Sequence, residues 1–250
     1  MTAQRPHTEL ALFSGGAMRR FLTEALPLFE QATGIKVSAH FAITRLLKKE
    51  IEDGAAFDMA LMPRSELDAL AGSGFIVAGS QTDIVRSIVG FIVRVGAPAP
   101  DILSVEAFKT VLRRAKSISH SQGPSGLYVA ALLERIGLAA EMKEKTVLAI
   151  GRPVGEVVAS GEAEIGMQQI IENQPVQGAH LVGPLPRELG NFVAYSAGFA
   201  SRVADHAFAR SLVAFLKSPA SVRIIREKGM EPAQDWLKPD SADVLAPSGF

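Results

Sequence analysis

Strand-like and helix-like segments alternate along the chain, and this alternation limits the possible folds more than any other feature of the sequence. In the N-terminal third, short apolar runs are followed by stretches with apolar residues at helical spacing. Gly34 and Gly54 stand where two of these stretches end, as glycines at helix C-termini commonly do. Repeated units of this kind predict an α/β protein with mixed, mostly parallel sheets and helices on their faces. The expected strands are 9–14, 35–41 and 57–63, and the expected helices are 18–34, 44–54 and 65–74.

Two longer β-rich runs, near residues 87–95 and 191–200, enclose a block of about 100 residues in which the alternation continues. We interpret this pattern as one lobe inserted into another. The first lobe would comprise residues 1–86 and 196–250, and the second residues 87–195. Two crossover strands would join the lobes, with a ligand cleft between them, and the polar tail after Trp236 is expected to be loose.

The composition excludes several classes of function. The 26 basic and 26 acidic residues balance and the pI is 7.0, which argues against a nucleic-acid-binding protein. The chain has no cysteine, so disulfides, thiolate metal sites and cysteine nucleophiles are excluded. No apolar run is long enough to insert into a membrane, and the N-terminus lacks the apolar segment of a signal peptide. The localisation stays open: periplasmic if a signal peptide has been trimmed, cytoplasmic if this N-terminus is native.

Four strand-to-helix junctions are rich in small or hydroxyl-bearing residues. They are Ser14–Met18, Ala42–Arg45, Ser121–Gly126 and Gly151–Val154. A helix N-terminus carries unpaired N–H groups and a partial positive charge, and small residues let an anion approach them. The junctions therefore predict a binding site for a small anion.

Four segments carry a resemblance to a known family: "LFSGGAMRRFLTEALPLFEQATGIKVSAHF", "RLLKKEIEDGAAFDMALMP", "GPSGLYVAALLERIGL" and "VVASGEAEIGMQQIIE". In this order and spacing, over residues 9–232, they resemble the molybdate-binding protein family. The resemblance implies the type II periplasmic-binding-protein fold, with two α/β lobes that close on a ligand by hinge motion. It also implies that short hydroxyl side chains and backbone N–H groups hold the ligand.

The chain departs from the family pattern where the resemblance places ligand contacts. Ala17 stands in place of a serine, Thr44 keeps a hydroxyl, and Arg45 follows where a small residue is usual. Gln169, beside Gln168, replaces a tyrosine. Because arginine grips carboxylates in a bidentate manner, these changes favour an organic carboxylate over an oxyanion. The candidate ligand-binding residues are Ser14, Gly16, Ala17, Met18, Thr44, Arg45, Ser121, Ser125, Gly126, Arg152, Val154, Gln168 and Gln169.

Structural interpretations compete with several of these assignments. Ser125 is also a candidate N-cap of the helix that follows it, and Arg45 a candidate solvated side chain. Asp58 is expected to brace a loop through backbone N–H groups rather than to act as a base. If the chain is an enzyme, His120 and Glu156 are the candidate proton-transfer residues. The histidines show no metal-site spacing, so neither a metal nor a cofactor is expected.

Two classes of function fit these features. In the first, the chain is a monomeric solute-binding protein that captures a small anion for an ABC-type permease, binds no nucleic acid and does not itself insert into a membrane. In the second, it is a cytoplasmic isomerase or lyase of a small di- or tricarboxylate, resembling aconitate isomerase on the same fold. A ligand sensor without chemistry is a third alternative, because a fold alone does not decide function.

Overall fold

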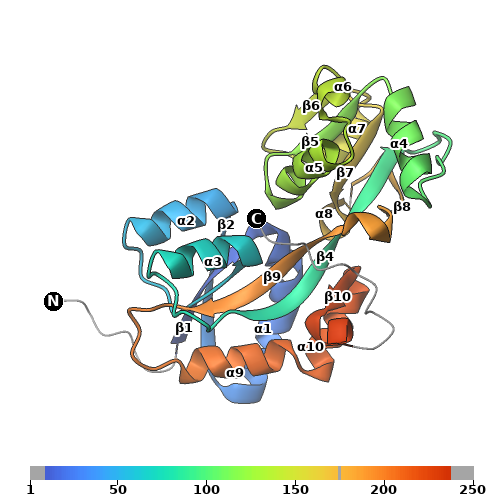
Figure 1. The fold of residues 1–250 in the computed structure, drawn as a ribbon. Helices are drawn as coiled ribbons and strands as arrows, with labels where there is room; N and C mark the ends of the chain where they lie inside the picture. The colour runs from blue at the N-terminus through green and yellow to red at the C-terminus, as the bar shows by residue number, and fades with distance from the viewer. Residues whose placement is uncertain (1–8, 174–175, 238–250) are drawn as a thin grey trace. The chain divides into compact units, whose positions relative to one another are not determined.

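A computed structural model describes residues 9–173 and 176–237, which form two compact units. Of the described residues, unit 1 contains 9–86 and 194–235, and unit 2 contains 87–173, 176–193 and 236–237. Both boundaries fall within strands, β4 (Thr82–Arg94) and β9 (Phe192–Phe199), so each of these strands contributes to both units (Figure 1). The predicted lobes, 1–86 with 196–250 and 87–195, differ from these units at 194–195 and in the tail. Residues 1–8 and 238–250 lie outside the described residues.

In unit 1, three parallel strands form the sheet and β9 extends it antiparallel to the third. The strand order is β2-β1-β3-β9, and the ladders β1–β2 and β1–β3 are parallel. Helices α2 and α3 lie on one face of this sheet, and α1 and α9 lie on the other (Figure 1). The elements are β1 (Glu9–Gly15), η1 (Gly16–Met18), α1 (Arg19–Thr33), β2 (Lys36–Ala42), α2 (Thr44–Glu52), β3 (Met59–Pro63), α3 (Arg64–Gly72), α9 (Ala207–Leu216), α10 (Pro219–Glu227), β10 (Met230–Pro232) and η3 (Ala233–Leu237).

In unit 2, the parallel strands β7, β5 and β6 lie side by side, and β4 pairs antiparallel with β7. Strand β8 also pairs antiparallel with β4. The elements are α4 (Val105–Arg114), β5 (Ile118–Ser121), α5 (Pro124–Arg135), α6 (Ala139–Lys143), β6 (Thr146–Ala149), α7 (Val154–Ala159), β7 (Ile165–Gln169), α8 (Ile170–Asn173), β8 (Ala179–Pro184) and η2 (Arg187–Leu189). The mixed, mostly parallel α/β architecture confirms the fold class predicted from the sequence.

Each unit has its own apolar core, because the strands present apolar residues to helices on both faces. In unit 1, residues of β1 and β3 pack with α2 and α3, while Phe29 of α1 meets Phe215 of α9 edge to face. In unit 2, the larger cluster lies on the side of α4, α5 and α6, and a smaller one lies under α7. Each unit therefore has apolar clusters of its own on the faces of its sheet.

Two local hydrogen bonds stabilise element ends, and the second confirms the predicted role of Asp58. Ser104 is the N-cap of α4, and its hydroxyl accepts a hydrogen bond from the Ala107 N–H. Asp58 braces the start of β1, because its carboxylate accepts the Ala11 N–H at 2.6 Å. Within the described residues, no helix is both long and apolar enough to cross a bilayer.

Candidate ligand-binding site

In unit 1, the C-terminal ends of β1 and β2 bring together two of the predicted junctions. Gly15 pairs with Ala42, and a Cβ on Gly15 would lie 3.5 Å from Thr44 Oγ1 and 3.6 Å from the Tyr195 ring. Both α1 and α2 begin here without a side-chain cap, so their first N–H groups have no partner from a capping side chain. We call Ser14–Met18, Thr44 and Arg45 the unit 1 cluster.

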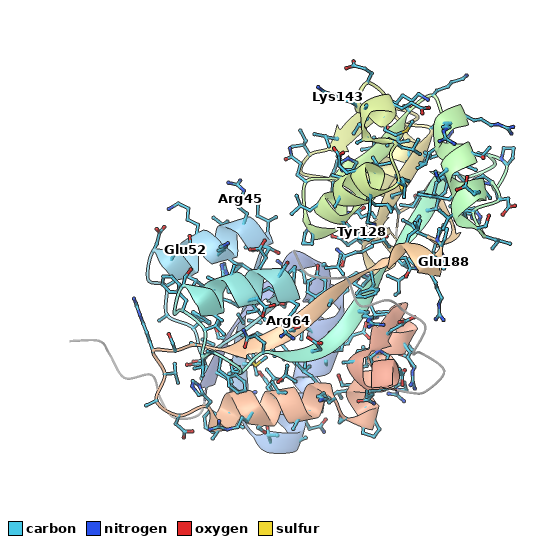
Figure 2. All side chains as sticks on the ribbon, viewed as in Figure 1. Arg45, Glu52, Arg64, Tyr128, Lys143 and Glu188 are labelled. Atoms are coloured by element: carbon cyan, nitrogen blue, oxygen red, sulfur yellow. The ribbon has the colours of Figure 1, made fainter. Side chains whose placement is uncertain are left out.

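The members of the unit 1 cluster differ in how far a ligand can reach them. Ser14 is fully buried, with its Oγ 3.4 Å from the Gly15 carbonyl, and the Met18 side chain belongs to the core. Gly16 is exposed, and Ala17 and Thr44 are half-buried. Arg45 is exposed, and Figure 2 shows its side chain extending away from α2. The groups accessible to a ligand are therefore the backbone at Gly16 and Ala17, the Thr44 hydroxyl and the Arg45 guanidinium.

In unit 2, the turn between β5 and α5 is tighter than a cap alone requires. A Cβ on Gly126 would lie 1.7 Å from the Ser121 carbonyl oxygen, so only glycine fits there. Ser121 Oγ accepts the Gly123 N–H at 3.2 Å and lies 3.4 Å from Ser125 Oγ. Two serine hydroxyls and the first turn of α5 thus meet at one point.

The interpretation of Ser125 as the N-cap of α5 is wrong. The N-cap is Gly123, Pro124 occupies the first helical position, and Ser125 lies inside the first turn, 1% exposed. Proline favours the first helical position because its missing N–H would have no partner there and its φ is already helical. Ser121, which precedes the helix, accepts the N–H of the N-cap residue Gly123 itself, and no side chain caps the first turn.

A chain of hydrogen bonds connects three other elements of unit 2. Gln168, at the end of β7, accepts the Val154 N–H at the start of α7, with 2.8 Å between Val154 N and Gln168 Oε1. Gln168 also donates to the carboxyl of Glu172 on α8. Gln169 Nε2 donates to the same carboxyl at 3.2 Å. We call Ser121–Gly126, Val154, Gln168, Gln169 and Glu172 the unit 2 cluster.

Burial raises the pKa of Glu172 from an ordinary 4.5 to about 7, although the amide hydrogen bonds from Gln168 and Gln169 lower it. The residue as a whole is half-buried, while Gln168 and Gln169 are 5% and 0% exposed. The enclosed carboxyl therefore exchanges its proton near neutral pH. Carboxyls tuned in this way are common at binding and catalytic sites.

Sequence reasoning did not identify Glu172. It follows Gln169 and Gln168 by three and four residues, but these glutamines end strand β7 and Glu172 lies on α8, so helical spacing does not indicate their contact. The burial that shifts its pKa was not visible, because that burial depends on how α8 packs on β7 and β8.

The other residues predicted as ligand-binding or proton-transfer candidates lie outside the two clusters. Arg152 is exposed and paired with Glu162, with 2.5 Å between Arg152 Nη2 and Glu162 Oε2. Glu156 is exposed in the first turn of α7. The His120 ring lies against α5 and α6, in a pocket that the turn residues Ser121–Gly126 do not line.

Tyr128 has a structural role, because its hydroxyl donates to the Leu189 carbonyl at 3.1 Å, and Arg135 donates to the same oxygen. Burial also raises the Tyr128 pKa above its ordinary value. Among the described residues, no three His, Asp or Glu side chains are grouped closely enough to hold a metal ion.

Comparison with known proteins shows the family and the fold of this chain. The model of a bacterial extracellular solute-binding protein family matches residues 10–231. An aconitate isomerase from Pseudomonas sp is 32% identical over 238 residues, which cover 93% of this chain and 91% of that protein. The molybdate-binding protein ModA of Azotobacter vinelandii is 27% identical over 217 residues, 80% of this chain and 81% of that protein.

The solved structures show the same fold. The substrate-binding domain of a putative molybdenum ABC transporter from Clostridium difficile superposes with a TM-score of 0.72 at 18% identity. The match covers 89% of this chain and 98% of that one. These matches confirm both the periplasmic-binding-protein fold and the resemblance to molybdate-binding proteins that the sequence predicted.

Proposed function

The chain belongs to the bacterial extracellular solute-binding protein family, and on that premise we propose that it binds a small organic carboxylate and delivers it to an ABC-type transporter. In this proposal, the unit 1 cluster and the unit 2 cluster each offer polar groups to a small organic acid. The half-buried Thr44 hydroxyl and the exposed backbone at Gly16 supply neutral donors. Arg45 supplies a guanidinium that suits a carboxylate.

One observation carries the choice of a carboxylate: Gln168 Oε1 already accepts the Val154 N–H. Because this N–H is already bonded within the protein, one of the donors that a cage around a tetrahedral oxyanion would need has a partner. An organic acid carries its charge on separate carboxylates and offers hydroxyl or carbon groups between them. The mixture of amide and carboxyl groups around Gln168 therefore favours an organic acid.

We expect citrate or an aconitate isomer to raise the melting temperature, and molybdate and sulfate to leave it unchanged. A ligand at 100 times its dissociation constant stabilises the folded state by about 2.7 kcal/mol, which a thermal-shift assay detects readily. Stabilisation by molybdate without stabilisation by any carboxylate would overturn the proposal.

Variants in the same assay test the residues. Thr44→Val and Arg45→Gln are expected to weaken carboxylate binding about tenfold each, because each removes one direct donor. Thr23→Val and Arg114→Gln are matched controls, since both side chains are exposed and lie outside the clusters. Unchanged affinity in Arg45→Gln would remove Arg45 from the site.

A second function, isomerisation of a small tricarboxylate, is favoured by the position and pKa of Glu172. A carboxyl whose pKa is about 7 can both take and return a proton at neutral pH. The Glu172 carboxylate would remove a proton from the CH₂ carbon of an aconitate, the double bond would shift, and the proton would return to the former alkene carbon. The 32% identical aconitate isomerase supports this alternative.

Incubation with trans-aconitate in D₂O separates the two functions. For the isomerase we expect the cis isomer and deuterium at the exchanging carbon, both visible by ¹H NMR, and a loss of both in Glu172→Gln. For the pure binding protein we expect a thermal shift with neither product nor exchange. Turnover that persists in Glu172→Gln would exclude Glu172 as the base.

A further inference from the structure

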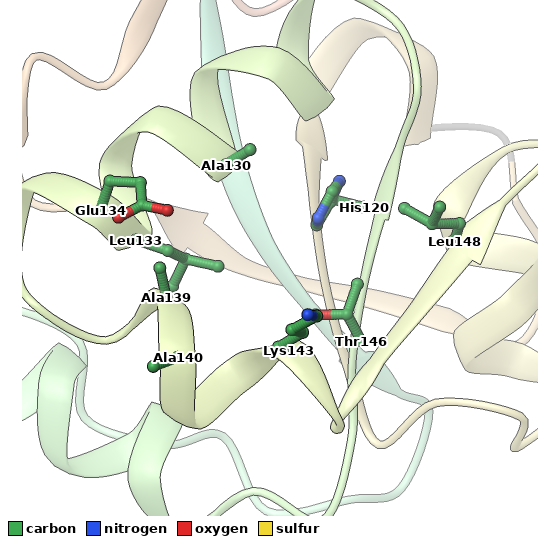
Figure 3. Close-up of a pocket in the computed structure, with 9 residues that line it drawn as sticks. All are labelled: His120, Ala130, Leu133, Glu134, Ala139, Ala140, Lys143, Thr146 and Leu148. Carbon is green, nitrogen blue, oxygen red and sulfur yellow. The ribbon is translucent and has the colours of Figure 1, made fainter.

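His120 lies in a pocket of unit 2 that the proposed function does not use. The pocket is formed by β5, α5, α6 and β6, and its volume is about 500 Å³ (Figure 3). Side chains alternate along a strand, so His120 projects from the opposite face of β5 to its neighbours Ser119 and Ser121. The lining residues are His120, Ala130, Leu133, Glu134, Ala139, Ala140, Lys143, Thr146 and Leu148.

The tautomer of His120 is fixed by its hydrogen bond. Its Nδ1 lies 2.9 Å from the Ser121 carbonyl oxygen, which can only accept, so Nδ1 carries the proton. In the neutral ring, Nε2 is therefore an acceptor. The residue is 9% exposed and lines the pocket, so this acceptor is the polar part of a wall that is otherwise largely apolar.

Two side chains of opposite charge, Glu134 and Lys143, line the same pocket as the His120 imidazole. Glu134 on α5 and Lys143 on α6 have no hydrogen bond or ion pair with another side chain in the part of the chain that the structure describes. In Figure 3, the Glu134 carboxylate lies on one side, next to Leu133 and Ala139, and the Lys143 ammonium lies beside Thr146 on the other. Thr146 donates its own hydroxyl to the Met142 carbonyl at 2.8 Å, which leaves Lys143 as the donor at that end.

One anionic group, one cationic group and an apolar lining match a small molecule that carries the complementary groups. We propose that this pocket binds a free amino acid with an aliphatic side chain, whose carboxylate pairs with Lys143 and whose ammonium pairs with Glu134. His120 Nε2 accepts a second hydrogen bond from the ammonium. The aliphatic side chain packs on Leu133 and Leu148, and the pocket volume is ample for a ligand of this size.

The site is independent of carboxylate binding at the two clusters, because the lining residues of the pocket include no member of either cluster. Failure of either proposal therefore leaves the other standing. The amino-acid proposal also predicts selectivity by charge. A ligand without the carboxylate leaves Lys143 without its partner, and a ligand without the ammonium leaves Glu134 without its partner.

The test is an NMR titration of the full-length protein with L-leucine, compared with 4-methylpentanoate, which lacks the ammonium, and 3-methylbutylamine, which lacks the carboxylate. We expect leucine to shift amide resonances of α5, α6 and β6 saturably, and both analogues to bind at least about tenfold more weakly. Lys143→Gln and Glu134→Gln should each weaken leucine binding about tenfold. Lys116→Gln and Glu144→Gln are matched controls, exposed and outside the pocket.

Three results would overturn the proposal. They are the absence of a saturable shift up to the solubility limit of leucine, equal binding of 4-methylpentanoate and leucine, and unchanged leucine binding in both pocket variants. The dispersion of each spectrum shows whether a variant is folded, so a loss of binding through unfolding is recognised directly.

Discussion

Replacing Gly126 by alanine is expected to destabilise unit 2 by about 3 kcal/mol or more, one of the two largest effects that the structure predicts. The added Cβ would lie 1.7 Å from the Ser121 carbonyl oxygen and 2.4 Å from its carbon, both of them backbone atoms. A flexible side chain could move aside, but the backbone between β5 and α5 cannot move without breaking the ladder or the helix. The strain must therefore separate α5 from the sheet.

Urea unfolding measures this loss, and hydrogen exchange locates it. We expect amide protection to fall first in β5 and α5, with protection in unit 1 reduced less. Gly72→Ala is the matched control, because it adds the same methyl group at a helical position with no atom within 4 Å. That control should be neutral or slightly stabilising. A Gly126→Ala protein that unfolds within about 0.5 kcal/mol of the parent would show that the turn relaxes freely.

Much of the fold could be predicted from the sequence because periodicity is a local property. Apolar residues at helical spacing, with glycine at the end, located α1, and alternation located β2. The strand-to-helix junctions were recognisable for the same reason, since small residues at a helix start are adjacent in the sequence. Strand pairing then placed the junctions of β1 and β2 together, at Gly15 and Ala42.

The details of the candidate site were harder to predict because they depend on packing. The bond from Val154 to Gln168 joins residues 14 positions apart and exists only because α7 lies against β7. The sequence also does not show which face of β5 is covered by α5, and that packing decides on which side of the sheet the His120 side chain lies. In contrast, the error at Ser125 was avoidable, because Pro124 at the first helical position already indicated Gly123 as the cap.

The second large effect concerns pH and Glu172. The folded-state pKa of about 7 lies above the ordinary 4.5, so the folded protein binds this proton more tightly than the unfolded chain. Below pH 4.5 both states are protonated and the full stabilisation is present. As the pH rises from 4.5 through 7 the stabilisation is lost, and its upper limit is about 3 kcal/mol. Glu172→Gln should remove this slope, because the amide keeps an acceptor for Gln168 and Gln169 without titrating.

Urea unfolding at a series of pH values tests this prediction. The variant should match the parent at pH 4 and be more stable above pH 7. Glu162→Gln is an informative comparison, because Arg152 lowers the Glu162 pKa and the sign of its pH effect is therefore opposite. Parallel stability curves for the parent and Glu172→Gln would show that the carboxyl is not enclosed. A variant that gains stability at high pH while losing its ligand or its turnover would show that the buried charge is kept for function, at a cost in stability.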